Sequence, residues 1–168
     1  VVYVSSGAVY GRDEGQLSED RPMNPSDPYG ATKAASEHMC YQYHETFGVD
    51  VLAARLFFVY GPPNAPGPDA GFNTKLFASL SGQKEVKLPK GRDQKGDWTY
   101  TKDAARGIAL MLEAESVEDR VFNIATGVYN PIDEIVAMIK QHTPDANIEI
   151  GSGVNLERGA PLDITRAR

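Results

Sequence analysis

Hydrophobic residues in this 168-residue chain gather into short apolar runs, which alternate with longer stretches of helical periodicity. The runs are rich in valine, isoleucine, leucine and phenylalanine, as the strands of a buried parallel sheet usually are. They predict strands over residues 1–5, 49–58, 86–88, 98–101, 120–125 and 147–150. The periodic stretches predict helices over residues 28–47, 72–82, 102–114 and 131–142. Strands that alternate with helices favour an α/β fold around a parallel sheet.

The predicted helices carry end signals and apolar stripes. Ser26 and Asp27 are candidate N-caps before Pro28, which suits the first helical position. Gly48 suits the residue that follows the last turn of the same helix. The residues expected to face the core are Ala105, Ile108, Ala109 and Leu112 in the third helix, and Ile135, Met138 and Ile139 in the fourth.

The composition indicates a globular protein. Hydrophobic residues make up 41% of the chain and charged residues 24%, with a formal net charge of -6. Because there is no basic block and no apolar run of membrane-spanning length, neither nucleic acid nor a membrane is an expected partner. Cys40 is the single cysteine, which rules out an internal disulfide and agrees with a predicted cytoplasmic location. The spacing of His38, His44 and His142 is not that of metal ligands, so no metal is expected.

Three polar residues carry the candidate chemistry. Tyr29 and Lys33 stand four residues apart at the start of a predicted helix, so their side chains lie on one face. A phenol beside an ammonium can exchange protons near neutral pH, because the positive charge favours the phenolate. Ser6 follows the first predicted strand, at the end of the sheet where ligands bind in open α/β folds. Its hydroxyl could hold a substrate hydroxyl in line with the phenol.

The stretches around these residues resemble one enzyme family. Five of them occur in order: residues 4–11 (VSSGAVYG), 28–33 (PYGATK, with Glu37 one turn later), 55–62 (RLFFVYGP), 97–100 (DWTY, with Asp103) and 122–127 (FNIATG). They resemble the extended short-chain dehydrogenase/reductase family, the NAD-dependent epimerases and dehydratases, over residues 1 to about 127.

The resemblance implies a doubly wound, Rossmann-type parallel sheet, of which this chain holds the C-terminal portion, with a small substrate-binding α+β region. Residues 1–60 would form the second half of the Rossmann-type domain and carry the catalytic residues. Residues 61–168 would contribute substrate-binding loops and returning elements of the sheet. Residues 61–71, with four prolines and three glycines, predict a long loop, which in this family covers substrate.

The resemblance also implies the roles of individual residues. Tyr29 would be the acid/base, Ser6 would hold the substrate hydroxyl, and Lys33 would hydrogen-bond the nicotinamide ribose. The cofactor, NAD or NADP, would contact Ser5, Tyr29, Lys33, Phe57, Phe58 and Val59. The substrate, a small sugar-like molecule, would contact Ser6, Gly7, Ala8, Tyr29, Phe58, Lys95 and Arg158.

Three departures from the family pattern bear on the substrate and the reaction. Phe58 stands where many members have an asparagine that touches the sugar, and Gly96 where sugar-nucleotide members have an arginine that clamps the diphosphate. Both changes weaken the case for a nucleotide sugar and favour a smaller polar substrate. Gly7 and Ala8 replace the Asp-Glu pair of the dehydratases, so elimination of water lacks its acid and base.

The expected reaction is hydride transfer at a secondary alcohol of a sugar or nucleotide sugar, with an epimerase favoured over a dehydrogenase. The alternatives are a dehydrogenase of a free sugar or sugar acid and a non-catalytic fragment.

No Gly-x-Gly-x-x-Gly loop occurs, and the chain opens on an apolar run without methionine. We therefore expect a segment of a longer protein that binds NAD poorly alone.

A homodimer is also expected from the resemblance, because members of this family often associate through the helix that bears the tyrosine. Met39, Tyr43 and Phe47 on that helix could form the contact face, or they could pack inside the monomer.

Overall fold

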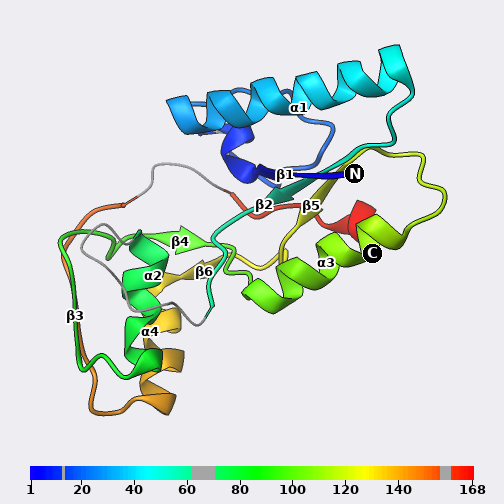
Figure 1. The fold of residues 1–168 in the computed structure, drawn as a ribbon. Helices are drawn as coiled ribbons and strands as arrows, with labels where there is room; N and C mark the ends of the chain where they lie inside the picture. The colour runs from blue at the N-terminus through cyan, green and yellow to red at the C-terminus, as the bar shows by residue number, and fades with distance from the viewer. Residues whose placement is uncertain (13, 62–70, 156–159) are drawn as a thin grey trace.

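A parallel sheet with a helix on each face forms the larger part of the molecule (Figure 1). The computed structural model describes residues 1–12, 14–61, 71–155 and 160–168. Strands β1 (Val2–Ser6), β2 (Leu52–Leu56) and β5 (Val121–Ile124) pair in the order β1-β2-β5, all parallel. Helix α1 (Pro28–Phe47) covers one face and α3 (Thr101–Glu113) the other (Figure 1). The predicted doubly wound α/β architecture is confirmed.

A smaller lobe lies beside this sheet (Figure 1). Its elements are α2 (Phe72–Leu76), a 3₁₀ turn over Phe77–Ser81, β3 (Glu85–Leu88), β4 (Lys95–Gly96), β6 (Asn130–Pro131), α4 (Ile132–His142) and β7 (Asn147–Ile150). Strand β3 pairs with β7 in parallel, and β4 pairs with β6 in antiparallel orientation. The core of the lobe is aliphatic and includes Leu76, Val86, Leu88, Ile132, Ile135, Ile139 and Ile148. These hydrophobic side chains hold the short strands in place, since two-residue ladders are weak by themselves.

The ends of α1 follow the sequence signals. Of the two candidate caps, Asp27 is the N-cap, and its carboxylate accepts a hydrogen bond from the Gly30 amide at 2.7 Å. Pro28 occupies the first turn. Gly48 adopts the left-handed conformation with φ of 66° and donates its amide to the carbonyl of His44 at 2.9 Å. The start of α1 is thereby fixed one residue before Tyr29.

Several predicted strands and helices differ from those observed. Residues 98–101 form no strand; Tyr100 makes one isolated bridge to Tyr60, and the strand of this region lies earlier, at β4. The strand predicted over residues 49–58 is confined to β2, and it ends before Phe58, whose φ is 37°. The helix predicted over residues 72–82 is α2 followed by the 3₁₀ turn. Two further 3₁₀ turns, over Gly7–Tyr10 and Thr165–Ala167, carry no periodic signal because each is so short.

The apolar stripe predicted for α3 does not face the core. Ala105, Ala109 and Leu112 are exposed and Ile108 is half-buried, whereas Ala104 is buried. The physical reason is that α3 packs closely against the sheet through its small residues. A Cβ at Gly107 would lie 2.8 Å from Cγ2 of Ile124. In α4, Ile135 and Ile139 are buried as predicted, but Met138 is largely exposed and Ile132 takes its place.

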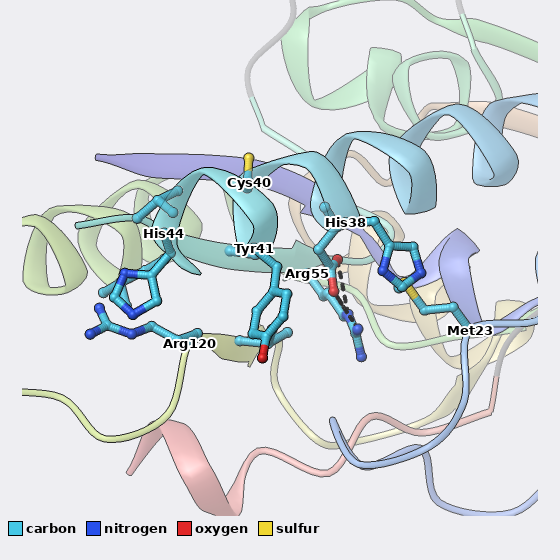
Figure 2. Close-up of a pocket in the computed structure, with 12 residues that line it drawn as sticks. Met23, His38, Cys40, Tyr41, His44, Arg55 and Arg120 are labelled. Atoms are coloured by element: carbon cyan, nitrogen blue, oxygen red, sulfur yellow. Dashed lines mark hydrogen bonds and ion pairs between the residues drawn. The ribbon is translucent and has the colours of Figure 1, made fainter. Parts of the chain in front are cut away.

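A buried ion pair joins α1 to the sheet. The guanidinium of Arg55 in β2 binds the carboxylate of Glu37 in α1 through Nε and Nη2, and both side chains are buried (Figure 2). The hydroxyl of Ser5 in β1 donates to the same carboxylate at 2.8 Å. Two strands and a helix are therefore tied together at one charged centre.

The network continues from Arg55 to the third strand. Arg55 Nη1 donates to the hydroxyl of Tyr10 at 2.8 Å, and Tyr10 donates to Oδ1 of Asn123 in β5 at 2.8 Å. The Asn123 amide group donates to the carbonyls of Leu17 and Asp163, each at 2.9 Å. Burial raises the pKa of Tyr10, against the opposing effect of the Arg55 charge. Because every member is hydrogen-bonded, the network can be buried without leaving an unpaired charge.

Of the helices in the described part of the chain, none combines the length and the apolar character that a membrane crossing requires.

Replacing Glu37 by alanine should destabilise the fold strongly. Glu37→Ala leaves the Arg55 guanidinium buried without a carboxylate, which costs about 3–5 kcal/mol. Urea denaturation of the full-length protein measures the loss, with Glu45→Ala, an exposed glutamate on the same helix, as the matched control. A loss no larger than that of the control would contradict the structural role of the pair.

Candidate functional site

The candidate site is a cavity of about 320 Å³ at the carboxyl ends of β1 and β2. Seven of the residues predicted from the sequence line it: Ser5, Ser6, Tyr29, Lys33, Phe57, Phe58 and Val59. The remaining lining residues are Val4, Leu56 and Asn73. Parallel strands place their carboxyl ends at one edge of the sheet, and ligands bind at this edge in open α/β folds. The structure therefore brings Ser6, Tyr29 and Lys33, the predicted catalytic trio, together in one cavity.

Tyr29 and Lys33 reach the cavity from the first two turns of α1. Half of the Tyr29 side chain is exposed. The Lys33 ammonium donates to the carbonyl of Val4 at 2.8 Å and lies 5.9 Å from the centre of the Tyr29 ring. It also lies 5.3 Å from the centre of the Tyr3 ring, a contact that the sequence did not suggest. The bond to Val4 holds the charge beside the phenol and leaves two further N–H groups for a ligand.

Ser6 lies at the end of β1, where its Oγ accepts a hydrogen bond from the amide of Ala8 at 3.2 Å and so caps the turn over Gly7–Tyr10. The hydroxyl proton of Ser6 can still be donated, since a serine hydroxyl both donates and accepts. The cap fixes the direction of the Ser6 side chain at the edge of the cavity.

The other predicted residues near β1 have structural contacts. The Ser5 hydroxyl donates its hydrogen bond to Glu37, so the predicted contact of Ser5 with the cofactor would come from the Ser5 backbone. Gly7 and Ala8 are buried and lie outside the lining of the cavity. A Cβ at Gly7 would lie 2.9 Å from Cδ2 of Phe57, so the absence of a side chain lets the Phe57 ring approach.

Of the two predicted cationic contacts, Lys95 is described by the structure and is not part of the cavity lining. Lys95 is exposed on β4, next to Gly96. Arg158 lies outside the described residues. Arg92, in the same region as Lys95, pairs with Asp133 at 3.2 Å. Among the described residues that line the cavity, Lys33 is the single cation.

Asn73 is a lining residue that was not predicted from the sequence. It lies in α2, and its Nδ2 donates to the carbonyl of Val59 at 3.3 Å. The contact ties the smaller lobe to the end of β2. No motif surrounds Asn73, so only the tertiary structure could place it here.

Asp97 clamps the loop that follows β5. Its buried carboxylate accepts hydrogen bonds from the Thr126 amide at 2.9 Å, the Thr126 hydroxyl at 2.5 Å and the Gly127 amide at 2.8 Å. Burial raises the pKa of Asp97, whereas the hydrogen bonds from Thr126 and Gly127 oppose the rise. The clamp fixes the segment that presents Trp98 to Phe58.

Phe58 combines a strained backbone with an aromatic stack. Its φ of 37° lies in the left-handed region, which costs a bulky residue on the order of 1–3 kcal/mol. The ring stacks on Trp98 with centroids 4.8 Å apart and meets the edge of Phe57 at 4.5 Å. The aromatic contacts offset the backbone strain, and the rings form an apolar wall of the cavity.

A second cavity, of about 290 Å³, lies between α1 and the sheet (Figure 2). Its walls are mainly apolar, and the Glu37–Arg55 pair is part of them. Cys40 and Tyr41 of α1 and Arg120 also line it. Burial raises the pKa of the Cys40 thiol, and the Glu37 charge adds to the rise. A thiol with a raised pKa is less reactive than a free cysteine.

A family model described as the NAD dependent epimerase/dehydratase family matches residues 1–125. The chain belongs to this family. The matched region includes the predicted catalytic trio, the Glu37–Arg55 pair and the Phe58–Trp98 stack.

The relatives of this chain include both epimerases and dehydratases. An uncharacterised UDP-glucose epimerase of Bacillus subtilis is 31% identical over 139 residues, which cover 83% of this chain and 43% of that protein. A dTDP-glucose 4,6-dehydratase of an Actinoplanes species is 36% identical over 128 residues, covering 75% of this chain and 38% of that protein. The chain thus spans less than half the length of these two relatives.

Solved structures of the family have the same fold. The UDP-glucuronic acid 4-epimerase of Bacillus cereus, in complex with NAD, has a TM-score of 0.79 at 30% identity, covering 99% of this chain and 52% of that chain. The UDP-glucose 4-epimerase of Thermotoga maritima, with UDP-glucose, has a TM-score of 0.82 at 25% identity, covering 99% of this chain and 55% of that chain.

Replacing Asp97 by asparagine should weaken the contact between Asp97 and the loop at Thr126 and Gly127. In Asp97→Asn an amide NH₂ group faces backbone donors, so one buried hydrogen bond is lost, at a cost of about 1–3 kcal/mol. The free energy of unfolding in urea measures the effect, with the exposed Asp145→Asn as the control for the same chemical change. Equal stability of the two variants would show that the clamp does not support the fold.

Proposed function

We propose that this chain carries the catalytic and substrate-binding part of an NAD-dependent enzyme that transfers hydride at a secondary alcohol of a sugar. The observation that carries the proposal is the cavity that collects Ser6, Tyr29 and Lys33 at the carboxyl ends of two parallel strands. Family membership supports it, since the matched family is NAD-dependent. Solved relatives contain NAD, UDP-glucuronic acid or UDP-glucose.

The residues around the cavity fit the nicotinamide end of NAD. Lys33 has N–H groups left for a ribose hydroxyl, and Phe57 and Val59 offer an apolar edge for a flat ring. No Gly-x-Gly-x-x-Gly loop for the pyrophosphate occurs in the chain. When bound, NAD supplies the hydride acceptor for the alcohol carbon.

The chain supplies the proton chemistry. Tyr29, as phenolate, takes the proton of the substrate hydroxyl while the C–H bond at the same carbon is broken. Lys33 stabilises the phenolate by its charge, and Ser6 donates a hydrogen bond to the substrate oxygen. Return of the proton from Tyr29 to the oxygen completes the reverse reaction. If the ketone rotates in the site before hydride returns to its other face, the result is epimerisation. If the ketone leaves the site, the result is dehydrogenation.

Epimerisation of a nucleotide sugar is the favoured form of this activity, supported by the epimerases among the relatives. Dehydration is less favoured because Gly7 and Ala8 offer no acid or base next to Ser6. A dehydrogenase of a free sugar or sugar acid is the second candidate. The observation that favours it is the apolar wall at Phe57, Phe58 and Val59, where the described lining residues offer no cation for a diphosphate.

Tyr29→Phe should abolish turnover and leave the fold intact. Removal of the proton-transfer group should lower kcat by about 10²–10⁴-fold. Nicotinamide absorbance and analysis of epimeric products, with free sugars and nucleotide sugars offered to the full-length protein, measure the effect. Tyr41→Phe is the matched control, because both tyrosines lie on α1 and both are 51% exposed. Activity of Tyr29→Phe above a tenth of the wild-type value would overturn the acid/base role.

A homodimer through α1 is part of the proposal. Met39, Tyr43 and Phe47 lie four residues apart on one face of the helix and are exposed, so they do not pack into the core of this chain. Tyr43 and Phe47 also contact each other, with ring centroids 5.5 Å apart. An exposed row of large apolar side chains on one helix is typical of an interface.

A charge placed in this row should dissociate the dimer. Met39→Glu would bury an unpaired carboxylate in the interface, so the full-length protein should sediment as a monomer at micromolar concentration. Leu110→Glu on α3 is the control, since Leu110 is 58% exposed and Met39 is 59% exposed. If both variants keep the mass of the wild type, α1 is not the interface.

A further inference from the structure

The strained residue Phe58 lies in the wall of the cavity that holds Tyr29 and Lys33. A large side chain with positive φ is rare, and such residues gather at functional sites where the surrounding structure fixes them. Here the stack on Trp98 and the edge contact with Phe57 fix the ring. The position of the Phe58 ring is therefore a feature that the fold maintains at a cost.

Gly96 makes this ring position possible. A Cβ at Gly96 would lie 2.7 Å from Cδ2 and 3.0 Å from Cε2 of Phe58, and 3.1 Å from Cε2 of Trp98. The backbone of Gly96 is outside the positive-φ region, so its conformation does not demand glycine. Space for the Phe58 ring is the reason that the structure offers for a residue without a side chain at position 96.

Trp98 is held from two sides. Its indole N–H donates to the carbonyl of Asn130 at 3.4 Å, and the preceding residue, Asp97, binds the Thr126–Gly127 loop. Phe77 adds an edge contact to the indole at 6.0 Å. Since Trp98 cannot easily move away, a side chain at position 96 would have to displace Phe58.

The wall formed by Phe58 is uncharged. Among the described residues of the cavity, the one charge is on Lys33, and its ammonium is bonded to the Val4 carbonyl on the side of Tyr29. Among the described lining residues, Asn73 is the polar residue from the smaller lobe, and its Nδ2 is bonded to the Val59 carbonyl. A ligand group at the aromatic wall meets hydrocarbon, which favours C–H surface over phosphate.

We propose that Phe58, held in place by Gly96 and Trp98, is a specificity-determining residue that packs against the apolar C–H face of the sugar ring whose hydroxyl meets Tyr29. The inference rests on the proposed function and adds the means of substrate selection. Phe58 and Gly96 act as a coupled pair, because a side chain at position 96 acts on the sugar through the displaced ring.

A double-mutant cycle at positions 58 and 96 tests the proposal by binding rather than turnover. Calorimetry on the NAD-loaded, full-length protein measures the affinity for four probes: glucose, glucuronic acid, UDP-glucose and UDP-glucuronic acid. For the probe that binds best, Phe58→Ala should weaken binding at least tenfold. Gly96→Ala should weaken it similarly, and the double variant should be no weaker than Phe58→Ala alone.

Phe77→Leu is the matched control. Phe77 is a buried aromatic residue that touches Trp98 but does not line the cavity, so its replacement should change the affinity less than twofold. Phe58→Asn places a residue that tolerates positive φ at this position, and it should still weaken binding tenfold. This variant distinguishes the effect of losing the ring from the effect of relieving the backbone strain. Circular dichroism confirms that each variant is folded.

Three results would overturn the proposal: no probe binds, Phe58→Ala binds as the wild type does, or Gly96→Ala is equally harmful in the Phe58→Ala background. The proposed function is judged separately by hydride transfer. If the wild type turns over substrate but Phe58→Ala binds the probes with unchanged affinity, the specificity role is wrong and the proposed enzymatic function stands. If the affinities follow the predicted cycle but the wild type shows no turnover, the sugar site stands and the proposed reaction is wrong.

Discussion

The buried pair of Glu37 and Arg55 is the constraint on which the rest of the structure depends. Two opposite charges in a dry core must meet in good geometry, and their remaining atoms must be hydrogen-bonded. Ser5, Tyr10 and Asn123 meet that requirement, so both sheet neighbours of β2 and the turn after β1 are bound to one centre. A slip of one residue in any of these elements would leave a charge unpaired, so the network specifies register more than it adds stability.

The same constraint positions the chemistry. Tyr29, Lys33 and Glu37 follow each other at intervals of four residues, so they share one stripe of α1. Fixing Glu37 against β2 sets the rotation of the helix, and the Asp27 cap sets where the helix begins. Lys33 then reaches the Val4 carbonyl, and the tyrosine faces the end of β1. The proposed catalytic residues are thus placed by a structural residue two turns away.

The cavity has two walls of different character. One side offers a hydroxyl, a phenol and an ammonium, which suit proton transfer at a substrate alcohol. The other side is the aromatic stack of Phe57, Phe58 and Trp98, with Gly96 leaving the room that the stack needs. Polar groups that orient a ligand beside an apolar wall that receives its carbon surface are the usual composition of a small-molecule site. The departures from the family pattern at residues 58 and 96 are therefore physically one change.

Local signals in the sequence determined the order of the longer strands and helices, the stop at Gly48 and a cap at Ser26 or Asp27, because these depend on neighbours within a few positions. The structure selected Asp27 as the cap. The strand predicted at residues 98–101 and the stripe predicted for α3 were wrong, since short apolar runs and helix faces are decided by what packs on them. Ala104 and Gly107 face the sheet because they allow close approach to Ile124, a residue distant in sequence. Only the tertiary structure could decide that Asn73 lines the cavity, that Ser5 binds Glu37, and that Gly96 leaves room for the Phe58 ring. Each of these depends on a distance between elements that no local pattern encodes.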